Sequence, residues 1–214
     1  MKQCYAIAPA RIVQYLDAEI DYILSLIQPT DSVLELGCGY GRITKKIAEI
    51  ANNVTGIDTA NDSLQLAKAN EGLESKITYL KMDATQMEFR DMTFDVVFCV
   101  QNGICAFGVD KSILIQEALR VTQPGGKVIF SSYSNNIWAD RLRWFELQSA
   151  HGLVGEIDYQ RTGQGTIACK DGFYASSLTT GEFQALCTEQ GITPELTEID
   201  NSSIMCLIIR PQPV

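Results

Sequence analysis

The sequence predicts an α/β fold built on a mainly parallel β-sheet with helices on both faces. Two observations indicate this fold. Short apolar runs typical of buried strands alternate with amphipathic helical segments, and a glycine-rich loop follows the first of these runs. Strands that alternate with helices favour right-handed crossover connections, which give a parallel sheet. The length of 214 residues suits one domain with a core of its own.

A long amphipathic helix is expected near the start of the chain, because apolar residues recur at helical spacing from Ile12 to Ile27. Pro29 closes this helix, since proline disfavours helical geometry in the residue before it. The Gln-Pro-Gly-Gly segment at 123–126 has the composition of a tight turn. The elements expected between these points and up to residue 131 are strand 32–36, helix 42–52, strand 54–57, helix 62–70, strand 77–81, strand 94–100, helix 111–121 and strand 127–131.

The alternation breaks between residues 134 and 178. A helix is expected at 136–151, followed by short strands at 156–161 and 166–170. One face of that helix carries Trp138, Leu142, Phe145 and Ser149.

The end of the chain returns to regular elements. Thr179 and Glu182 have the spacing of a capping box, which predicts a helix at 180–190. Strands at 195–199 and 204–209 follow, and the connection between them is short enough for a hairpin.

Charge and cysteine content argue against several classes of protein. The chain carries 26 acidic and 17 basic side chains, a formal charge of -9, which disfavours nucleic acids and anionic membrane surfaces as partners. Its seven cysteines lack metal-ligand spacing, so neither a disulfide framework nor a metal site is expected. No apolar stretch is long enough for a signal peptide or a membrane span. We therefore expect a soluble cytoplasmic protein.

A glycine-rich loop with a preceding carboxylate follows the first predicted strand, where Glu35, Gly37, Gly39 and Gly41 stand at alternate positions. In an open α/β sheet, ligands bind at the edge where such strands end. A dinucleotide-binding loop needs glycine at the position of Arg42, and the Gly-Lys-Ser/Thr sequence of a P-loop is also missing. Glycines at this spacing suit close approach of a ligand that lacks a pyrophosphate.

Residues 33–42, Val-Leu-Glu-Leu-Gly-Cys-Gly-Tyr-Gly-Arg, resemble motif I of the class I S-adenosylmethionine-dependent methyltransferases. Further matches follow in the family's order. Asp58 ends the second predicted strand and Asp83 follows the third. Segments 94–103 and 119–130 resemble motif IV and the turn before the family's fifth strand. Taken together, the matched segments resemble those of a methyltransferase type 11/25-like domain.

The resemblance implies a three-layer, Rossmann-like fold with seven strands in the order 3-2-1-4-5-7-6, the last strand antiparallel and a small cap inserted after strand five. It implies S-adenosylmethionine as the cofactor and S-adenosylhomocysteine as the product. Asp58 is then expected to bind the ribose hydroxyls, and Asp83 the adenine amino group beside the Ala84 amide. The residues expected in the cofactor site are Glu35, Gly37, Cys38, Gly39, Tyr40, Arg42, Asp58, Thr59, Asp83, Ala84, Val100 and Gln101.

The methyl acceptor is less well defined by the sequence, because methyl transfer mainly requires alignment and exclusion of water. Residues 100–103 lack the prolines and the aromatic residue of the family's nucleic-acid enzymes, which argues against DNA or RNA as substrate. The candidates for a catalytic role are Asn102, Tyr133 and His151, the only histidine. Asn102 is alternatively a turn residue, and His151 a helix end.

The aromatic residues of the 134–178 stretch either line an apolar pocket or form the core of a small subdomain. These residues are Trp138, Trp144, Phe145, Tyr159, Phe173 and Tyr174.

We expect one domain of 214 residues that methylates an oxygen, nitrogen or sulfur atom of a small, partly apolar metabolite, as a monomer or homodimer. Its expected parts are a helical lid at 1–29, a cofactor-binding core at 30–133, an inserted substrate cap at 134–178 and a helix and hairpin at 179–214. Three alternatives stay open: a cofactor-binding or partner subunit without turnover, a protein side-chain methyltransferase, and an aminopropyl transferase. The last would favour extra carboxylates after the fourth strand, and none is present there.

Overall fold

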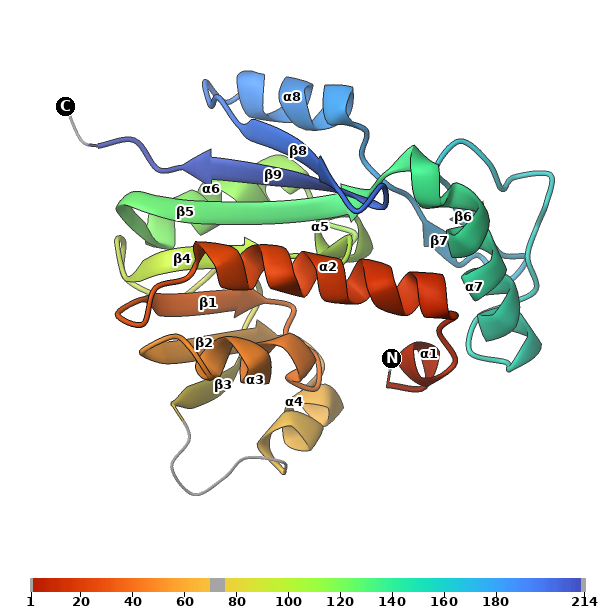
Figure 1. The fold of residues 1–214 in the computed structure, drawn as a ribbon, viewed down its shortest axis with the longest axis horizontal. Helices are drawn as coiled ribbons and strands as arrows, with labels where there is room; N and C mark the ends of the chain where they lie inside the picture. Colours follow the sequence, from red (N-terminus) through yellow and green to blue (C-terminus); the bar gives the residue numbers. More distant parts are fainter. Residues whose placement is uncertain (1, 70–75, 213–214) are drawn as a thin grey trace.

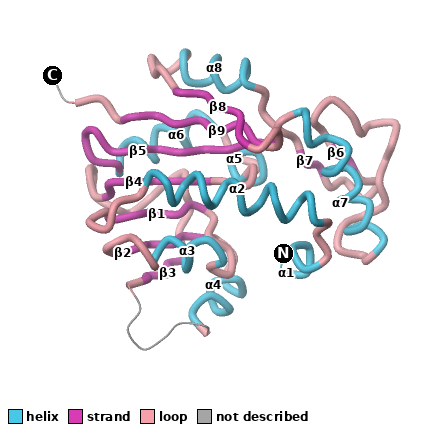
Figure 2. Tube along the Cα trace, viewed as in Figure 1, coloured by secondary structure: helices cyan, strands magenta, loops and turns pink. Residues whose placement is uncertain are grey.

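The computed structural model describes residues 2–69 and 76–212 (Figures 1 and 2). Its strands are β1 (Ser32–Leu36), β2 (Asn53–Asp58), β3 (Ile77–Lys81), β4 (Phe94–Cys99), β5 (Thr122–Tyr133), β6 (Ile167–Ala168), β7 (Tyr174–Ala175), β8 (Glu195–Ile199) and β9 (Ser203–Ile209). Its helices are α1 (Lys2–Ala6), α2 (Ala10–Leu26), α3 (Arg42–Ala48), α4 (Asn61–Lys68), α5 (Gly103–Ala106), α6 (Lys111–Val121), the 3-10 helix η1 (Asn135–Ile137), α7 (Trp138–Ala150) and α8 (Thr180–Thr188). Residue 70, where a helix was predicted to end, lies outside the described residues.

Seven of the strands form one sheet in the order β3-β2-β1-β4-β5-β9-β8. The strands from β3 to β5 pair in parallel, and β9 runs antiparallel to both β5 and β8. This sheet confirms the predicted α/β class, the strand order and the antiparallel last strand, because β8 and β9 are the sixth and seventh predicted strands. The remaining two strands, β6 and β7, pair with each other.

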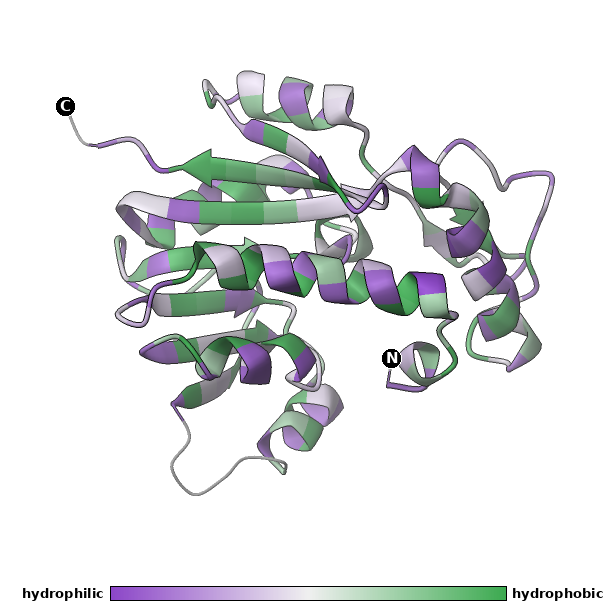
Figure 3. Ribbon diagram, viewed as in Figure 1, coloured by the Kyte–Doolittle hydropathy of each residue, from purple (hydrophilic) through white to green (hydrophobic). Residues whose placement is uncertain are grey.

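Helices cover both faces of the sheet (Figure 1). α2 and α3 pack on one face, where Ile20, Ile47 and Phe98 belong to one apolar cluster. α6 and α8 pack on the opposite face, where Leu114 and Phe183 belong to a second cluster. Figure 3 shows apolar residues concentrated in the central strands between these layers, as expected for parallel strands covered on both sides. Among the helices in the described ranges, none combines the length and apolar content needed to cross a bilayer.

The predicted turn at 123–126 is wrong, because this segment is part of β5, which begins at Thr122. The register of β5 against β4 shifts at this point, so the segment forms a bulge. The segment also pairs with the chain after β9: Gly125 N donates to Arg210 O, and Arg210 N donates to Gly126 O, both at 2.9 Å.

The predicted strand at 156–161 is also wrong, because Ile157 alone makes a bridge there, to Cys169. β6 pairs instead with β7, which follows directly in the chain. Gly172, at φ +96°, allows the tight turn between them, so the local hairpin replaces the more distant pairing.

The predicted capping box at the start of α8 is confirmed. Thr179 N donates to Glu182 Oε2 at 2.7 Å, and Glu182 N donates to Thr179 Oγ1 at 3.2 Å. The two bonds satisfy backbone donors that the helix itself leaves unpaired.

Replacing Thr179 by Ala should lower the free energy of unfolding by about 1 kcal/mol, because the Glu182 amide loses its acceptor. Urea unfolding followed by circular dichroism measures this change. Thr180→Ala is the matched control, since within the described structure the Thr180 side chain makes no hydrogen bond. Equal losses in both variants would contradict the cap.

Candidate functional site

Two cavities adjoin where the parallel strands end. The cap cavity, about 400 Å³, lies between the glycine loop, α1 and residues of the 134–178 segment, and the strand cavity, about 370 Å³, lies over the ends of β2 and β3. Gly37, Ala106 and Phe107 line both cavities, so they meet at the glycine loop. This position is the ligand edge expected for such a sheet.

Every residue predicted for the cofactor site lines one of these cavities. The cap cavity contacts Glu35, Gly37, Cys38, Gly39, Tyr40, Arg42, Val100 and Gln101. The strand cavity contacts Gly37, Asp58, Thr59, Asp83 and Ala84. The fold thus brings together residues from four separate connections.

The glycine loop folds back onto the end of β2. Gly37, Gly39 and Gly41 have φ angles of +73°, +55° and +78°, a region that glycine adopts without strain. The amides of Gly37 and Cys38 both donate to Ile57 O, at 2.8 and 2.9 Å. The loop and β2 therefore form one hydrogen-bonded unit.

Glu35 is buried near the end of β1 and faces the cap cavity. Thr44 Oγ1, from α3, donates a hydrogen bond to its carboxylate. Burial raises the pKa of Glu35 to about 7, although the bond from Thr44 and the charge of Arg42 act in the opposite direction. The side chain consequently exchanges its proton near neutral pH.

Asp58 and Asp83 keep part of their hydrogen-bonding capacity for a ligand. Asp58 Oδ2 accepts from Gly39 N at 2.8 Å, and its Oδ1 accepts from Ala60 N at 2.7 Å. Asp83 Oδ1 accepts from the amide and hydroxyl of Thr85, and these bonds hold the pKa of Asp83 below its ordinary value. A carboxylate offers about four acceptor sites, so sites remain on both.

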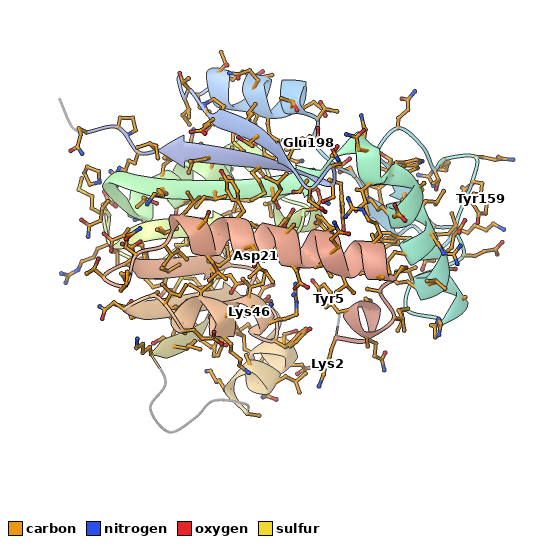
Figure 4. The ribbon with its side chains drawn as sticks, in the orientation of Figure 1. Lys2, Tyr5, Asp21, Lys46, Tyr159 and Glu198 are labelled. Atoms are coloured by element: carbon orange, nitrogen blue, oxygen red, sulfur yellow. The ribbon has the colours of Figure 1, made fainter. Side chains whose placement is uncertain are left out.

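Arg42 and Tyr5 converge on Gln101, at the end of β4. Arg42 Nη2 donates to Gln101 Oε1 at 2.6 Å, and Tyr5 Oη donates to the same oxygen at 3.1 Å. The Arg42 guanidinium also lies 4.6 Å from the centroid of the Tyr5 ring. Figure 4 shows Tyr5 extending from α1 toward the body of the molecule. Trp144 Nε1 donates to Cys4 O at 3.0 Å, so α1 is held over the cap cavity from both sides.

Glu19, on α2, belongs to the frame of the site and was missed in the sequence. Its buried carboxylate accepts from Gln101 N at 2.5 Å and from the Ser203 hydroxyl. Gln101 and Asn102 have φ angles of +57° and +61°, which non-glycine residues seldom adopt. Burial raises the pKa of Glu19 to about 7. The sequence signal that could have identified Glu19 is its position, as a carboxylate on the apolar face of the first predicted helix.

Phe107, which follows α5, was also missed. Its ring packs directly on the glycine loop, because a Cβ atom at Gly37 would lie 2.5 Å from Phe107 Cζ. No sequence motif marks this contact, since it depends on how the chain turns after β4.

Tyr133 is the one predicted catalytic candidate that lines the cap cavity. The Arg141 guanidinium lies 4.2 Å from its ring centroid, and the Tyr15 ring packs 5.1 Å away. Burial raises the pKa of Tyr133 above its ordinary value, although Arg141 lowers it. The phenol therefore stays protonated at neutral pH, where it can donate a hydrogen bond but not accept a proton.

Asn102 and His151 lie outside both cavity linings. Asn102 Nδ2 donates to Ser176 O at 2.9 Å, and its Oδ1 accepts from Ser132 Oγ at 2.8 Å, so its amide joins β5 to the segment before α8. His151 is exposed at the end of α7, with Nδ1 2.8 Å from Leu147 O. Both positions match the structural alternatives given for these residues.

The aromatic residues of the 134–178 segment divide between two roles. Trp144, Phe145 and Phe173 line the cap cavity, and ring contacts at 6.0 and 5.9 Å connect them. Trp138 and Tyr174 line a separate cavity of about 740 Å³.

Phe145 also belongs to a small core with Ile157 and Ile167, against which Trp138 packs. Tyr159 is 64% exposed at the outer edge of this segment (Figure 4). In the described part of the chain, no three His, Cys, Asp or Glu residues lie close enough to hold a metal ion.

Comparison with known proteins finds a family model that matches part of the chain. Residues 34–130 match the family described as methyltransferase domain. The chain is 30% identical over 125 residues to a ubiquinone biosynthesis O-methyltransferase of Hydrogenovibrio crunogenus, covering 58% of this chain and 51% of that protein. It is 30% identical over 212 residues to a 2-methyl-6-phytyl-1,4-hydroquinone methyltransferase of Synechocystis, covering 92% and 63%. The chain thus spans about half to two thirds of these relatives.

Solved structures share the fold. A SAM-dependent methyltransferase from Methanosarcina mazei superposes with a TM-score of 0.65 at 21% identity, covering 90% of this chain and 98% of that one. The magnesium protoporphyrin IX methyltransferase of Synechocystis, solved with bound SAH, gives a TM-score of 0.59 at 15% identity, covering 92% and 82%. At these identities the likeness concerns the fold.

The free energy of unfolding should fall as the pH rises from about 4.5 to 7. The folded protein holds the Glu35 proton up to about pH 7, whereas the unfolded chain loses it near pH 4.5, so the folded state binds more protons between these values. The full shift corresponds to about 3 kcal/mol, and Glu19 contributes in the same direction.

Urea unfolding at pH 5, 6, 7 and 8 measures this slope, and Glu35→Gln should remove about half of it. Glu49→Gln, at an exposed position, is the control and should leave the slope intact. An unchanged slope in Glu35→Gln would show that the Glu35 pKa is not raised.

Proposed function

We propose that the chain is a class I S-adenosylmethionine-dependent methyltransferase, and that it transfers a methyl group from this cofactor to an oxygen, nitrogen or sulfur atom of a small, partly apolar metabolite. The observation that carries the proposal is the pair of adjoining cavities, which together contact all the residues that the family motifs predict.

The side chains around the two cavities fit the chemical groups of this cofactor. In the strand cavity, Asp58 would accept hydrogen bonds from the ribose hydroxyls, and Asp83 from the adenine amino group. In the cap cavity, the Glu35 carboxyl supplies hydrogen-bond acceptors for the amino group of a zwitterionic amino-acid end, and Arg42 supplies a cation for its carboxylate. Gly37, common to both cavities, lets one extended ligand pass close to the backbone.

When bound, S-adenosylmethionine supplies a methyl group activated by its sulfonium, for in-line displacement by the acceptor. The chain's own residues would orient the acceptor and exclude water. α1 would act as a lid, because Tyr5 and Cys4 tie it to Gln101 and Trp144 above the cap cavity. Tyr133 would donate a hydrogen bond to the acceptor.

We assign the acceptor to the side of the cap cavity that faces residues 134–178, the proposed substrate cap. The aromatic side chains Trp144, Phe145 and Phe173 favour a partly apolar small molecule there. Of the two relatives described above, one is named for ubiquinone biosynthesis and the other for a hydroquinone, which supports a small metabolite as the acceptor. The formal charge of -9 argues against nucleic acid as the substrate. We also propose a cytoplasmic location.

Asp58→Ala should weaken S-adenosylhomocysteine binding by about tenfold to a hundredfold, because a carboxylate that accepts from the ribose is lost. Isothermal titration calorimetry measures the Kd. Asp62→Ala, an exposed carboxylate on α4, is the control and should bind normally. Asp58→Asn keeps an acceptor for the Gly39 amide and separates loss of the ligand contact from distortion of the loop. Normal affinity in Asp58→Ala would refute the ribose assignment.

Methyl-labelled S-adenosylmethionine should yield S-adenosylhomocysteine and a labelled small molecule when the protein is incubated with a metabolite extract. Label that appears only in protein would indicate side-chain methylation instead. Cofactor binding without release of product in any extract would support a subunit without turnover.

A further inference from the structure

Two side chains on the buried face of α7, Arg141 and Gln148, carry hydrogen-bonding groups without a partner in the described structure, and of the two only Gln148 lines the cap cavity. Four residues form this face: Arg141, Trp144, Phe145 and Gln148. Arg141 donates to Gly165 O at 2.7 Å, and Trp144 donates to Cys4 O. Gln148 is 4% exposed, and its carboxamide has no hydrogen-bond partner among residues 2–69 and 76–212.

Gln148 lines the cap cavity beside an aromatic surface. Trp144 and Phe145 lie one helical turn before it on α7, and Phe173 reaches the same cavity from the turn between β6 and β7. The charged side chains of the lining, Glu35 and Arg42, both belong to the glycine-loop end. The α7 end of the cavity therefore presents aromatic rings and one free carboxamide.

We infer that Gln148 selects the methyl acceptor by hydrogen-bonding an uncharged polar substituent, such as a carboxamide, carbonyl or hydroxyl, on an aromatic ring that packs against Trp144 and Phe145. The inference rests on the proposed function, because it places the acceptor in the same cavity. A ligand that fills the cavity displaces water from the carboxamide, so a ligand that hydrogen-bonds it should bind more tightly than one that leaves it unpaired. Aromatic side chains pack well against a planar ring.

An uncharged substituent fits this end of the cavity better than an ionised one. A carboxylate would lose its hydration, and Arg141 would not compensate for that loss, because it lies outside the cavity lining and its Nη donors bond the carbonyls of Gly165 and Ala175. A cation would meet the same Arg141 guanidinium, which lies 4.2 Å from the Tyr133 ring centroid and 5.8 Å from that of Phe145. The carboxamide of Gln148 can both donate and accept, so it suits a neutral polar group.

The chain offers its own reporter for acceptor binding. Its two tryptophans are Trp138 and Trp144, and Trp144 alone lines the cap cavity. In a Trp138→Phe background, the fluorescence of Trp144 reports a ring that enters this cavity, without any methyl transfer. Four phenols that differ in the para substituent are the probes: 4-hydroxybenzamide, 4-hydroxybenzoate, tyramine and 4-ethylphenol.

We expect 4-hydroxybenzamide to bind about fivefold more tightly than 4-ethylphenol, and both ionised probes to bind more weakly than 4-hydroxybenzamide. Gln148→Leu in the same background should bring the benzamide-to-ethylphenol ratio close to one. Gln148→Glu should shift the preference toward tyramine, which tests the position with a second variant. Gln160→Leu, an exposed glutamine in the same segment, is the matched control and should change nothing.

Tighter binding of 4-hydroxybenzoate or tyramine to the Trp138→Phe protein would overturn the inference. A benzamide preference that persists in Gln148→Leu would do the same. Titration of each variant with S-adenosylhomocysteine keeps the two proposals apart. Loss of cofactor binding in the parent protein would refute the methyltransferase proposal, whereas an intact cofactor Kd with no Gln148-dependent preference would refute only the acceptor assignment.

Discussion

The site depends on one constraint, the parallel pairing of β1, β2, β3 and β4, which ends all four strands at one edge of the sheet. Backbone groups beyond a strand end still need hydrogen-bond partners. The glycine loop meets this need by reaching across to β2, where Ile57 O receives two amides and Asp58 receives a third, from Gly39. The loop shape and the position of Asp58 are therefore fixed by the same bonds.

The elements that the sequence predicted best are those set by local pattern. The predicted ranges 32–36, 77–81, 111–121 and 195–199 coincide with β1, β3, α6 and β8. The predictions were wrong for the bulge at 123–126 and for the hairpin formed by β6 and β7. In both places, strand pairing depends on which segment lies beside the backbone in the folded protein, and the pattern of residues in the sequence does not indicate that segment.

The same distinction separates the parts of the candidate site. Residues at the ends of strands, such as Glu35 near the end of β1 and Asp58 at the end of β2, have positions that follow from strand order, so a sequence motif identifies them. Tyr5 and Glu19 lie 96 and 82 residues from Gln101 in the chain, and their contacts arise only when α1 and α2 pack against the sheet end. Gln101 itself adopts a left-handed backbone conformation, which a glutamine in the sequence does not predict.

Buried polar groups explain how the irregular parts of the site are held. Glu19 and Arg141 are both buried, and each bonds backbone groups: Glu19 accepts from the Gln101 amide, and Arg141 donates to the Gly165 and Ala175 carbonyls. Such groups are costly to bury unless satisfied, so each fixes its loop in one arrangement. Gln148 sits on the same helix face as Arg141 without a partner. Glu19 and the Nη donors of Arg141 hold the backbone around the site, whereas Gln148 makes no such bond in the described structure and lines the cap cavity, where a ligand can reach its carboxamide.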